Sequence, residues 1–255
     1  MDESRDSAPG AGGASQATGA RKFRRVLLKF SGEALAGEKG FGIDPNVASY
    51  LARQVRLLHY HRIETGLVIG GGNIFRGVSA VSQGLSRVSA DYMGMLATII
   101  NALALQDVLN AAGMPTEVFT PFEMPAFASR FNAAHVMNSF AERKLALFAG
   151  GTGNPYFSTD SAAALKAAEI GAEILLKATK VDGMYDKDPV IHADAKKFDR
   201  LTFQEVLERN IRVMDQTAVA LCREVNMPIF VFNMMKEGNF ERLAKGDLSF
   251  GTLVS

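Results

Sequence analysis

Three apolar segments of this sequence end in glycines, and this pattern constrains the fold more than any other feature. Arg24–Phe30 runs into Ser31-Gly32, residues 66–69 run into a triple glycine, and residues 145–149 run into Gly150-Gly151. Short apolar runs of this kind are typical of buried parallel strands. The carboxyl ends of such strands meet at one edge of a sheet, where glycine turns and helix N-termini offer backbone N–H groups to anions. We therefore predict a parallel sheet whose carboxyl edge holds a phosphorylated ligand.

Helical patterns alternate with strand patterns along the rest of the chain. This alternation predicts an α/β protein, a three-layer αβα sandwich around a mainly parallel sheet, with a single domain over residues 21–255. Ser89 and Asp91 are predicted to open a long helix, and residues 251–254 to form an edge strand. The side chains predicted to face inward on that helix are Met93, Leu96, Ala97, Ile100, Leu103, Ala104 and Val108.

Composition excludes several classes of protein. A net charge of +1 over 255 residues gives no basic surface for nucleic acid. The single cysteine, Cys222, excludes an internal disulfide, and its helical context predicts a small buried side chain. We find no apolar run that approaches membrane-spanning length, and residues 1–20 are predicted to be a disordered tail.

General nucleotide and metal motifs are missing. Residues 32–39 resemble a P-loop in spacing but place a glutamate where the lysine belongs. No Gly-x-Gly-x-x-Gly sequence opens a helix after a strand, and the four histidines lack metal-ligand spacing. We predict no metal site built from the protein alone.

Lysines and an aspartate stand at the ends of the predicted elements. Lys29 ends the first strand, Lys177 ends the strand 174–177, and Asp160 begins a helix. Lone lysines at strand ends are usually only solvated, and Asp160 could be an ordinary helix cap. Together beside three glycine turns they could instead neutralise a migrating phosphoryl group, with Asp160 holding both lysines.

Seven ordered strings carry a resemblance to a known family. They are LLKFSGEAL (27–35), GFGID (40–44), VIGGGNIFRG (68–77), DYMGMLAT (91–98), TGNPYFSTDSA (152–162), LKATKVDGMY (176–185) and VMD (213–215). On these strings the chain resembles the bacterial uridylate (UMP) kinases of the amino-acid-kinase fold, from Arg24 to Ser255. Tyr156 and Ser158 depart from the phenylalanine and threonine that many members carry, and Ala90 and Tyr92 from glycine and histidine.

The resemblance implies transfer of the terminal phosphoryl group of ATP to UMP, with Mg2+, in pyrimidine biosynthesis. It implies catalytic roles for Lys29, Asp160 and Lys177. Contacts to ATP are implied for Lys29, Phe30, Ser31, Gly32, Gly72, Arg76, Thr179, Tyr185 and Asp188, with Asp215 a weaker candidate. Contacts to UMP are implied for Gly71, Asp91, Thr152, Gly153, Asn154, Pro155, Tyr156, Phe157, Ser158 and Thr159.

The resemblance also implies regulation and assembly. Members of the family are cytoplasmic hexamers that GTP activates and UTP inhibits, although not every member shows these effects. The loop Gly37, Glu38, Lys39, Gly40, Phe41 and Gly42 and the helix after Asp91 are the implied allosteric and assembly segments.

Two alternatives stay open at this point. Other kinases of the same fold act on carbamate, acetylglutamate, glutamate or aspartate, and they should lack the string at 152–162. A relative that binds nucleotide without catalysis is the second alternative, and the joint presence of Lys29, Asp160 and Lys177 argues against it.

Overall fold

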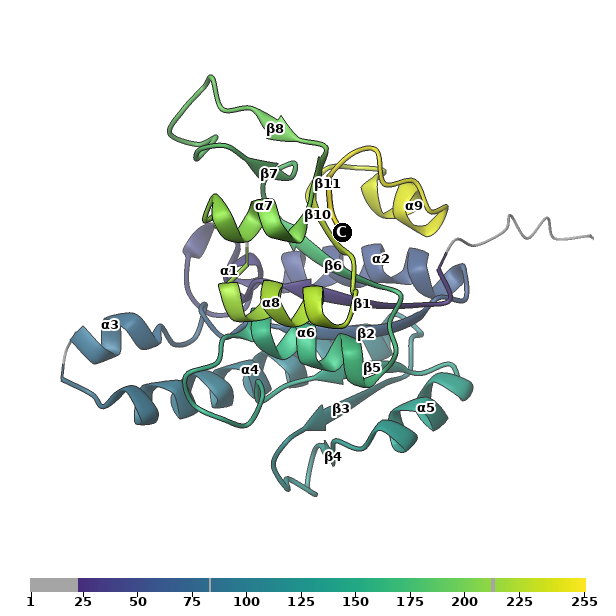
Figure 1. The fold of residues 1–255 in the computed structure, drawn as a ribbon. Helices are drawn as coiled ribbons and strands as arrows, with labels where there is room; N and C mark the ends of the chain where they lie inside the picture. The colour runs from purple at the N-terminus through teal and green to yellow at the C-terminus, as the bar shows by residue number, and fades with distance from the viewer. Residues whose placement is uncertain (1–22, 83, 212–213) are drawn as a thin grey trace, which may run out of the picture.

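The structure, a computed structural model, describes residues 23–82, 84–211 and 214–255 (Figure 1). Its centre is a sheet with the strand order β4-β3-β5-β2-β1-β6-β10-β11-β9, in which only the β10–β11 pair is antiparallel. The strands are β1 (Arg25–Phe30), β2 (Glu64–Ile69), β3 (Thr116–Thr120), β4 (Ser129–Arg130), β5 (Leu145–Phe148), β6 (Ile174–Thr179), β9 (Arg200–Leu201), β10 (Ile229–Asn233) and β11 (Thr252–Val254). This arrangement confirms the predicted α/β class.

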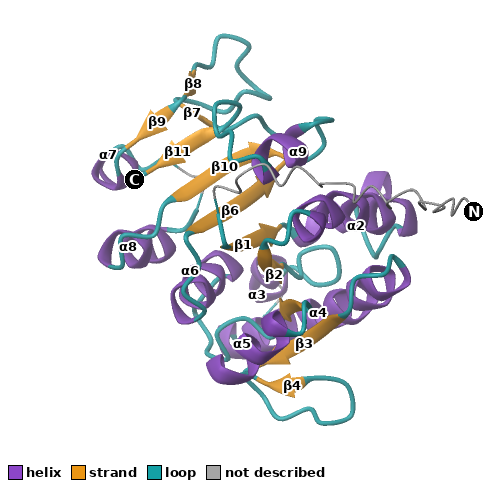
Figure 2. Ribbon diagram, turned by 90° about the vertical axis from the view of Figure 1, so that its right-hand side faces the viewer, coloured by secondary structure: helices purple, strands orange, loops and turns teal. Residues whose placement is uncertain are grey.

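Helices cover both faces of the sheet and bury a separate core on each (Figure 2). One layer contains α2 (Pro45–Tyr60), α4 (Arg87–Ala111) and α9 (Asn239–Ala244). The opposite layer contains α5 (Ala133–Ala141), α6 (Thr159–Glu169), α7 (Phe203–Glu208) and α8 (Gln216–Glu224). Shorter segments are α1 (Gly32–Leu35), the 3-10 helix η1 (Gly37–Lys39), α3 (Gly77–Ser82) and the hairpin strands β7 (Met184–Tyr185) and β8 (Lys197–Phe198).

The period of two along β1 and β6 decides where their lysines point. Leu28 and Leu176 pack in the core beneath α2 and α4, whereas Leu27 and Leu175 pack in the core beneath α6. Successive strand side chains alternate between faces. Lys29 and Lys177 therefore share the α6 face of the sheet with Leu27 and Leu175.

The predicted inner face of α4 is only partly correct: Ala97 is buried and Leu103 and Val108 pack partly buried against the core, but three other predicted residues point outward. Met93, Leu96 and Ile100 are 41%, 51% and 50% exposed. The buried face consists of Ala90, Met95, Ala97, Thr98, Ile99, Asn101, Ala102, Leu105 and Leu109. Because α4 is apolar on nearly all sides and carries polar residues on its inner side, hydrophobic periodicity does not identify the buried face.

Other boundaries also differ from the predictions. Ser86 caps α4, so this helix begins before Ser89. The C-terminal strand β11 is not an edge strand, because the two-residue strand β9 pairs with its outer side. The predicted tail, residues 1–20, lies outside the described residues.

Helix α4 is long and apolar enough to cross a membrane by length and composition alone, which corrects the expectation that no run approaches that length. Its inner side chains belong to the protein core, where Leu105 and Leu109 contribute to the cluster shared with β2 and β3. The buried face marks α4 as a core helix.

Candidate active site

Lys29 and Lys177 meet on one carboxylate. The two residues are register partners on the neighbouring parallel strands β1 and β6. The Lys29 Nζ lies 2.7 Å from Asp160 Oδ1, and the Lys177 Nζ lies 2.8 Å from Asp160 Oδ2. The three side chains are 9%, 12% and 15% exposed. The structure thus brings together the three predicted catalytic residues, and we call them the lysine–aspartate triad.

Burial and charge act in opposite directions on Asp160. Burial alone would raise the pKa of this carboxyl, but the two ammonium groups outweigh burial and hold the pKa below its usual value. Burial lowers the pKa of Lys177, and the attraction of Asp160 only partly opposes this shift. Two ammonium groups and one carboxylate leave a net charge of +1, which suits an incoming anion.

Asp160 does not cap its own helix. Ser158 is the N-cap of α6, and its hydroxyl accepts from the backbone N–H groups of Asp160 and Ser161 at 2.9 and 3.2 Å. The interpretation of Asp160 as an ordinary cap is therefore wrong. Because serine supplies the cap, the Asp160 carboxylate is available to both lysines.

A carboxylate from α8 fixes the start of α6. Asp215 caps α8 by accepting from the Ala218 N–H at 2.8 Å. Its carboxylate also accepts from the Ser158 hydroxyl and, at 3.0 Å, from the Ser161 hydroxyl. The N-termini of α6 and α8 are thereby joined beside the triad.

The three predicted glycine turns follow β1, β2 and β5, which are adjacent in the sheet. A Cβ on Gly32 would lie 2.4 Å from the Gly70 carbonyl oxygen, so only glycine fits at this contact between the first two turns. The Gly70 N–H donates to the Phe30 carbonyl at 3.1 Å. The Phe30 ring itself is fully buried in the core, which leaves only its backbone for a ligand.

A cavity of about 140 Å³ lies beside the second and third turns. Its lining includes five predicted UMP contacts, Gly71, Asp91, Phe157, Ser158 and Thr159, together with Gly72, a predicted ATP contact, and Gly151. Asp91 Oδ2 accepts from the Tyr156 N–H at 2.7 Å, and the Arg87 Nε donates to the same oxygen at 2.8 Å. Asp91 therefore joins the first turn of α4 to the loop 152–159.

The loop 152–159 is an exposed turn whose first residues hydrogen-bond to one another. Thr152 Oγ1 lies 3.2 Å from both the carbonyl oxygen and the backbone nitrogen of Asn154. Tyr156 adopts φ = 72°, and its ring stacks near the Arg87 guanidinium at 5.4 Å from the centroid. The remaining predicted members of this loop are Gly153 and Pro155.

Arg76 and Ser31 lie near the glycine turns. The Arg76 Nη2 is 3.0 Å from Glu33 Oε1, and its Nε donates to the Gly72 carbonyl at 3.3 Å. Ser31 is the N-cap of α1, and its side chain makes no capping hydrogen bond. Arg76 is more than half exposed, so its guanidinium is accessible to a ligand.

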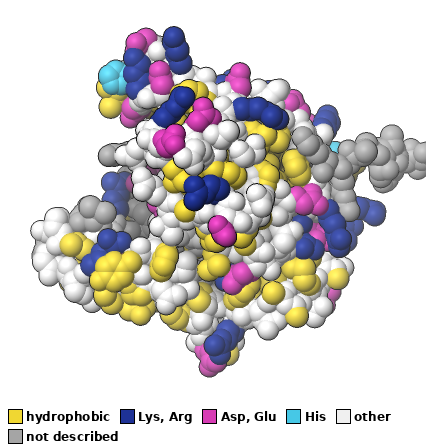
Figure 3. Space-filling model, in the orientation of Figure 1, with side chains coloured by type: hydrophobic (Ala, Val, Ile, Leu, Met, Phe, Trp, Pro, Cys, Tyr) yellow, Lys and Arg dark blue, Asp and Glu magenta, His cyan; other side chains and the backbone are white. Residues whose placement is uncertain are grey.

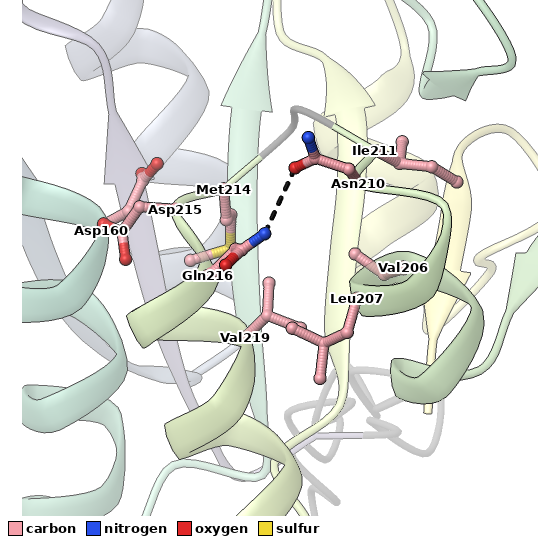
Figure 4. A pocket seen from close by; sticks show the side chains of 9 residues that line it. All are labelled: Asp160, Val206, Leu207, Asn210, Ile211, Met214, Asp215, Gln216 and Val219. Carbon is pink, nitrogen blue, oxygen red and sulfur yellow. Dashed lines mark hydrogen bonds between the residues drawn. The ribbon is translucent and has the colours of Figure 1, made fainter.

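A larger cavity, of about 380 Å³, opens beside Asp160 between α7 and α8 (Figure 4). Val206, Leu207 and Val219 form apolar walls, and the Gln216 Nε2 donates to Asn210 Oδ1 at 3.2 Å. Asp160, Ile211, Met214 and Asp215 complete the lining. The sequence predicts no role for the α7 residues, because no motif connects them with the triad.

Thr179 ends β6, Tyr185 lies on β7, and Asp188 lies in the connection between β7 and β8. None of the three is among the described residues that line the 380 Å³ cavity. The Thr179 hydroxyl donates to the Val181 carbonyl at 2.7 Å, and Asp188 Oδ1 accepts from the Val190 N–H at 2.9 Å. Asp188 thus stabilises the turn that contains Pro189. Burial and then the Asp182 charge raise the pKa of Tyr185.

The loop 37–42 is a 3-10 turn followed by exposed residues. Gly37, Gly40 and Gly42 have positive φ, and Phe41 is 68% exposed. The Gly42 N–H donates to the Asn73 carbonyl at 2.9 Å. This contact connects the predicted allosteric loop directly to the second glycine turn.

Comparisons with known proteins agree with this geometry. The sequence profile of the amino acid kinase family matches residues 24–233. A uridylate kinase of Wolinella succinogenes is 50% identical over 234 residues, which cover 91% of this chain and 97% of the relative.

Solved structures of UMP kinases share the fold. The UMP kinase of Bacillus anthracis superposes with a TM-score of 0.88 at 35% identity, over 92% of this chain and 97% of that one. The UMP kinase of Ureaplasma parvum gives 0.85 at 36% identity, over 91% and 98%. The uridylate kinase of Archaeoglobus fulgidus gives 0.65 at 26% identity, over 90% and 99%. The chain belongs to the amino acid kinase family and, within that family, to the UMP kinases.

Proposed function

We propose that this protein transfers the terminal phosphoryl group of ATP to UMP, giving ADP and UDP for pyrimidine nucleotide biosynthesis. The observation that carries the proposal is the lysine–aspartate triad at the edge where three glycine turns meet. The names of the relatives supply the acceptor: each is a kinase of UMP.

The triad supplies fixed positive charge and needs no general base. The attacking UMP phosphate is already an anion, so the protein has to position two anions and offset the charge that develops between them. Lys29 and Lys177 do this, and Asp160 holds their ammonium groups in place. Because the three groups are largely buried, their fields are screened less than they would be in water.

We assign the acceptor to the 140 Å³ cavity. The backbone N–H group of Gly71 would bind the UMP phosphate, and Asp91 would accept from the ribose. The ribose hydroxyl would donate to the Asp91 carboxylate either beside the Tyr156 N–H and the Arg87 Nε or in place of one of them. The loop of Thr152, Gly153, Asn154, Pro155, Tyr156, Phe157, Ser158 and Thr159 would enclose the uridine.

The donor belongs on the other side of the triad. In-line transfer requires the donor and acceptor to approach from opposite sides of the phosphoryl group. Of the proposed ATP contacts, Asp215 is the one among the described lining residues of the 380 Å³ cavity, which adjoins Asp160 from the α7–α8 side. Gly32, Gly72 and Arg76 would hold the ATP phosphates, with Phe30 and Ser31 contributing backbone groups. Thr179, Tyr185, Asp188 and Asp215 would lie along the nucleoside.

Mg2+ fits a donor site of this kind as a companion of ATP. Among the described residues there is no cluster of three or more histidine, cysteine, aspartate or glutamate side chains, and Mg2+ is commonly held by substrate phosphates and water with one or two carboxylates. Asp160 and Asp215, which line the large cavity, would be its nearest carboxylates. Bound Mg2+ would neutralise charge on the ATP phosphates.

We further propose a cytoplasmic homohexamer with GTP and UTP as effectors. Val88, Tyr92, Leu96 and Ile100 follow one another at intervals of four residues on α4 and are 39–51% exposed. Hydrophobic side chains gather in the part of Figure 3 where Figure 1 draws α4. Such a surface favours contact with a second copy. The loop 37–42 is the proposed effector-responsive segment, and residues 21–255 are proposed to form one catalytic domain.

A phosphorylation assay across acceptors tests the function. The purified protein with ATP and Mg2+ should form UDP from UMP much faster than it phosphorylates carbamate, acetylglutamate, glutamate or aspartate. If the protein preferred one of those acceptors, that acceptor and not UMP would be its substrate. Binding of ATP and UMP without any UDP would instead identify a nucleotide-binding protein that lacks kinase activity.

A further inference from the structure

Two buried polar side chains of α4 hold two of the glycine turns. Thr98 and Asn101 are three residues apart on α4 and are 2% and 0% exposed. Residues at this spacing lie on the same face of a helix, and here that face points to the carboxyl ends of β2 and β5. Buried polar groups are costly unless they are hydrogen-bonded, and both residues have hydrogen-bond partners in the glycine turns.

Thr98 holds the third turn. Its hydroxyl donates to the Met95 carbonyl at 2.6 Å and accepts from the Gly150 N–H at 2.8 Å. Gly150 begins the segment that leads into the loop 152–159. The Gly150 N–H, the first of the third turn, is therefore fixed by α4, which is distant in sequence.

The α4 backbone also limits the approach of the second turn. A Cβ on Gly71 would lie 2.8 Å from the Gly94 carbonyl oxygen and 3.1 Å from the Thr98 nitrogen. Only glycine allows this contact. The second turn thus packs against the same turn of α4 that holds Gly150.

Asn101 holds the second turn through a pair of amides. Its Nδ2 donates to the Gly70 carbonyl at 2.7 Å and to Asn73 Oδ1 at 2.6 Å. Asn73 returns a hydrogen bond from its Nδ2 to Asn101 Oδ1 at 2.9 Å and donates to the Gly42 carbonyl at 2.7 Å. Asn73 is 1% exposed, so this network is shielded from water.

We propose that Thr98 and Asn101 are positioning residues that set the distance between the second and third glycine turns and thereby the affinity for the acceptor phosphate. The inference rests on the proposed function, because it assigns these turns to UMP. Backbone donors bind an anion well when they are held in place before it arrives. The lysine–aspartate triad involves neither residue, and Thr98 holds the third turn, which carries no proposed ATP contact. Loss of the Thr98 hydroxyl should therefore weaken UMP binding more than ATP binding.

Thr98→Val tests the hydroxyl with little change in volume, and Thr98→Ser restores it. Thr65→Val is the matched control, because Thr65 is also fully buried and donates to a backbone carbonyl, that of Ile63, at the opposite end of β2. We expect Thr98→Val to raise KM for UMP roughly tenfold, a change that corresponds to about one hydrogen bond. KM for ATP should stay within about twofold, and Thr98→Ser and Thr65→Val should keep the UMP KM of the parent.

Asn101→Leu should also raise KM for UMP, with Asn239→Leu as its control. Asn239 is a buried amide that donates to the Asn233 carbonyl outside the glycine turns. Thermal unfolding of all variants separates lost stability from lost positioning. Equal effects of Thr98→Val and Thr65→Val on the UMP KM at similar stability, or equal losses for UMP and ATP in Thr98→Val, would overturn the proposal.

Amide hydrogen exchange and calorimetry distinguish this inference from the proposed function. Thr98→Val should speed exchange of the Gly150 amide, whereas Thr65→Val should not. If the parent forms no UDP, the proposed function fails, and weaker calorimetric binding of UMP to Thr98→Val than to Thr65→Val would still support positioning. Faster Gly150 exchange with unchanged UMP binding and unchanged KM would refute it.

Discussion

Lys29 and Lys177 are register partners on adjacent parallel strands, and their ammonium groups reach opposite oxygens of one carboxylate. The strand period fixes both side chains on the α6 face, and the Ser158 cap leaves Asp160 available at the start of α6. Placement of the two cations therefore depends on backbone geometry more than on side-chain flexibility.

The pH dependence of turnover should reflect Lys177. Burial lowers the pKa of this lysine below its usual value of 10.5, so as pH rises the ammonium loses its proton before an ordinary lysine does. The charged form of Lys177 is disfavoured in the folded state, so this group reduces the free energy of unfolding, and the reduction is greatest below its folded pKa. As pH rises toward 10.5 the reduction disappears and the folded protein gains stability. We expect kcat to fall with rising pH over the same interval.

A pH profile of Lys177→Arg provides the control, because the guanidinium stays charged throughout. The alkaline fall in kcat should disappear in this variant even if its maximum is reduced. An unchanged alkaline limb would show that another group titrates there.

Cys222 should be chemically inert in the folded protein. Burial raises the pKa of its thiol to about 12, and the charges of Asp160 and Asp215 add to the effect. The thiolate needed for reaction is therefore rare at neutral pH. A thiol-directed reagent should label Cys222 only after unfolding, and Cys222→Ala should keep turnover within about twofold at a cost of roughly 1 kcal/mol in stability. Rapid labelling of the native protein would contradict this account.

Charge on the outer face of α4 should disrupt assembly. Leu96→Glu and Ile100→Glu each place a carboxylate on a half-exposed apolar position, which an interface between copies would not tolerate without a partner. Analytical ultracentrifugation should show smaller particles for both variants. Tyr60→Glu, which alters a residue that is 77% exposed on α2, should leave the mass unchanged. An identical mass for parent and α4 variants would remove α4 from the interface.

Removal of residues 1–20 should leave turnover and particle mass unchanged. The segment is rich in glycine, alanine and serine and lacks an apolar core, so it has little surface to bury. Steady-state kinetics and ultracentrifugation of the truncated chain check this prediction. A loss of activity or assembly would assign the segment a structural role.

Local rules predict that the two lysines of the triad lie at one edge of the sheet, whereas the choice of Asp160 as their partner rests on the family resemblance. Glycines after apolar runs identify the sheet edge, and the two-residue period places Lys29 and Lys177 on one face. The buried face of α4 could not be predicted, because its apolar residues surround the helix and its inner side carries Thr98 and Asn101. The α7–α8 cavity was missed since it joins residues more than forty positions from Asp160, and two-residue strands such as β7 and β8 give no periodic signal.

The most direct measurement is the turnover of Asp160→Asn and Lys177→Ala compared with their affinity for ATP and UMP. Groups that act on the transition state should lower kcat by at least about a hundredfold, or about 2.7 kcal/mol, with little loss of nucleotide binding. Calorimetry gives the affinities and a coupled ADP assay gives kcat. A drop in turnover matched by an equal loss of binding would show that the triad holds substrates in the ground state and would contradict the proposed mechanism.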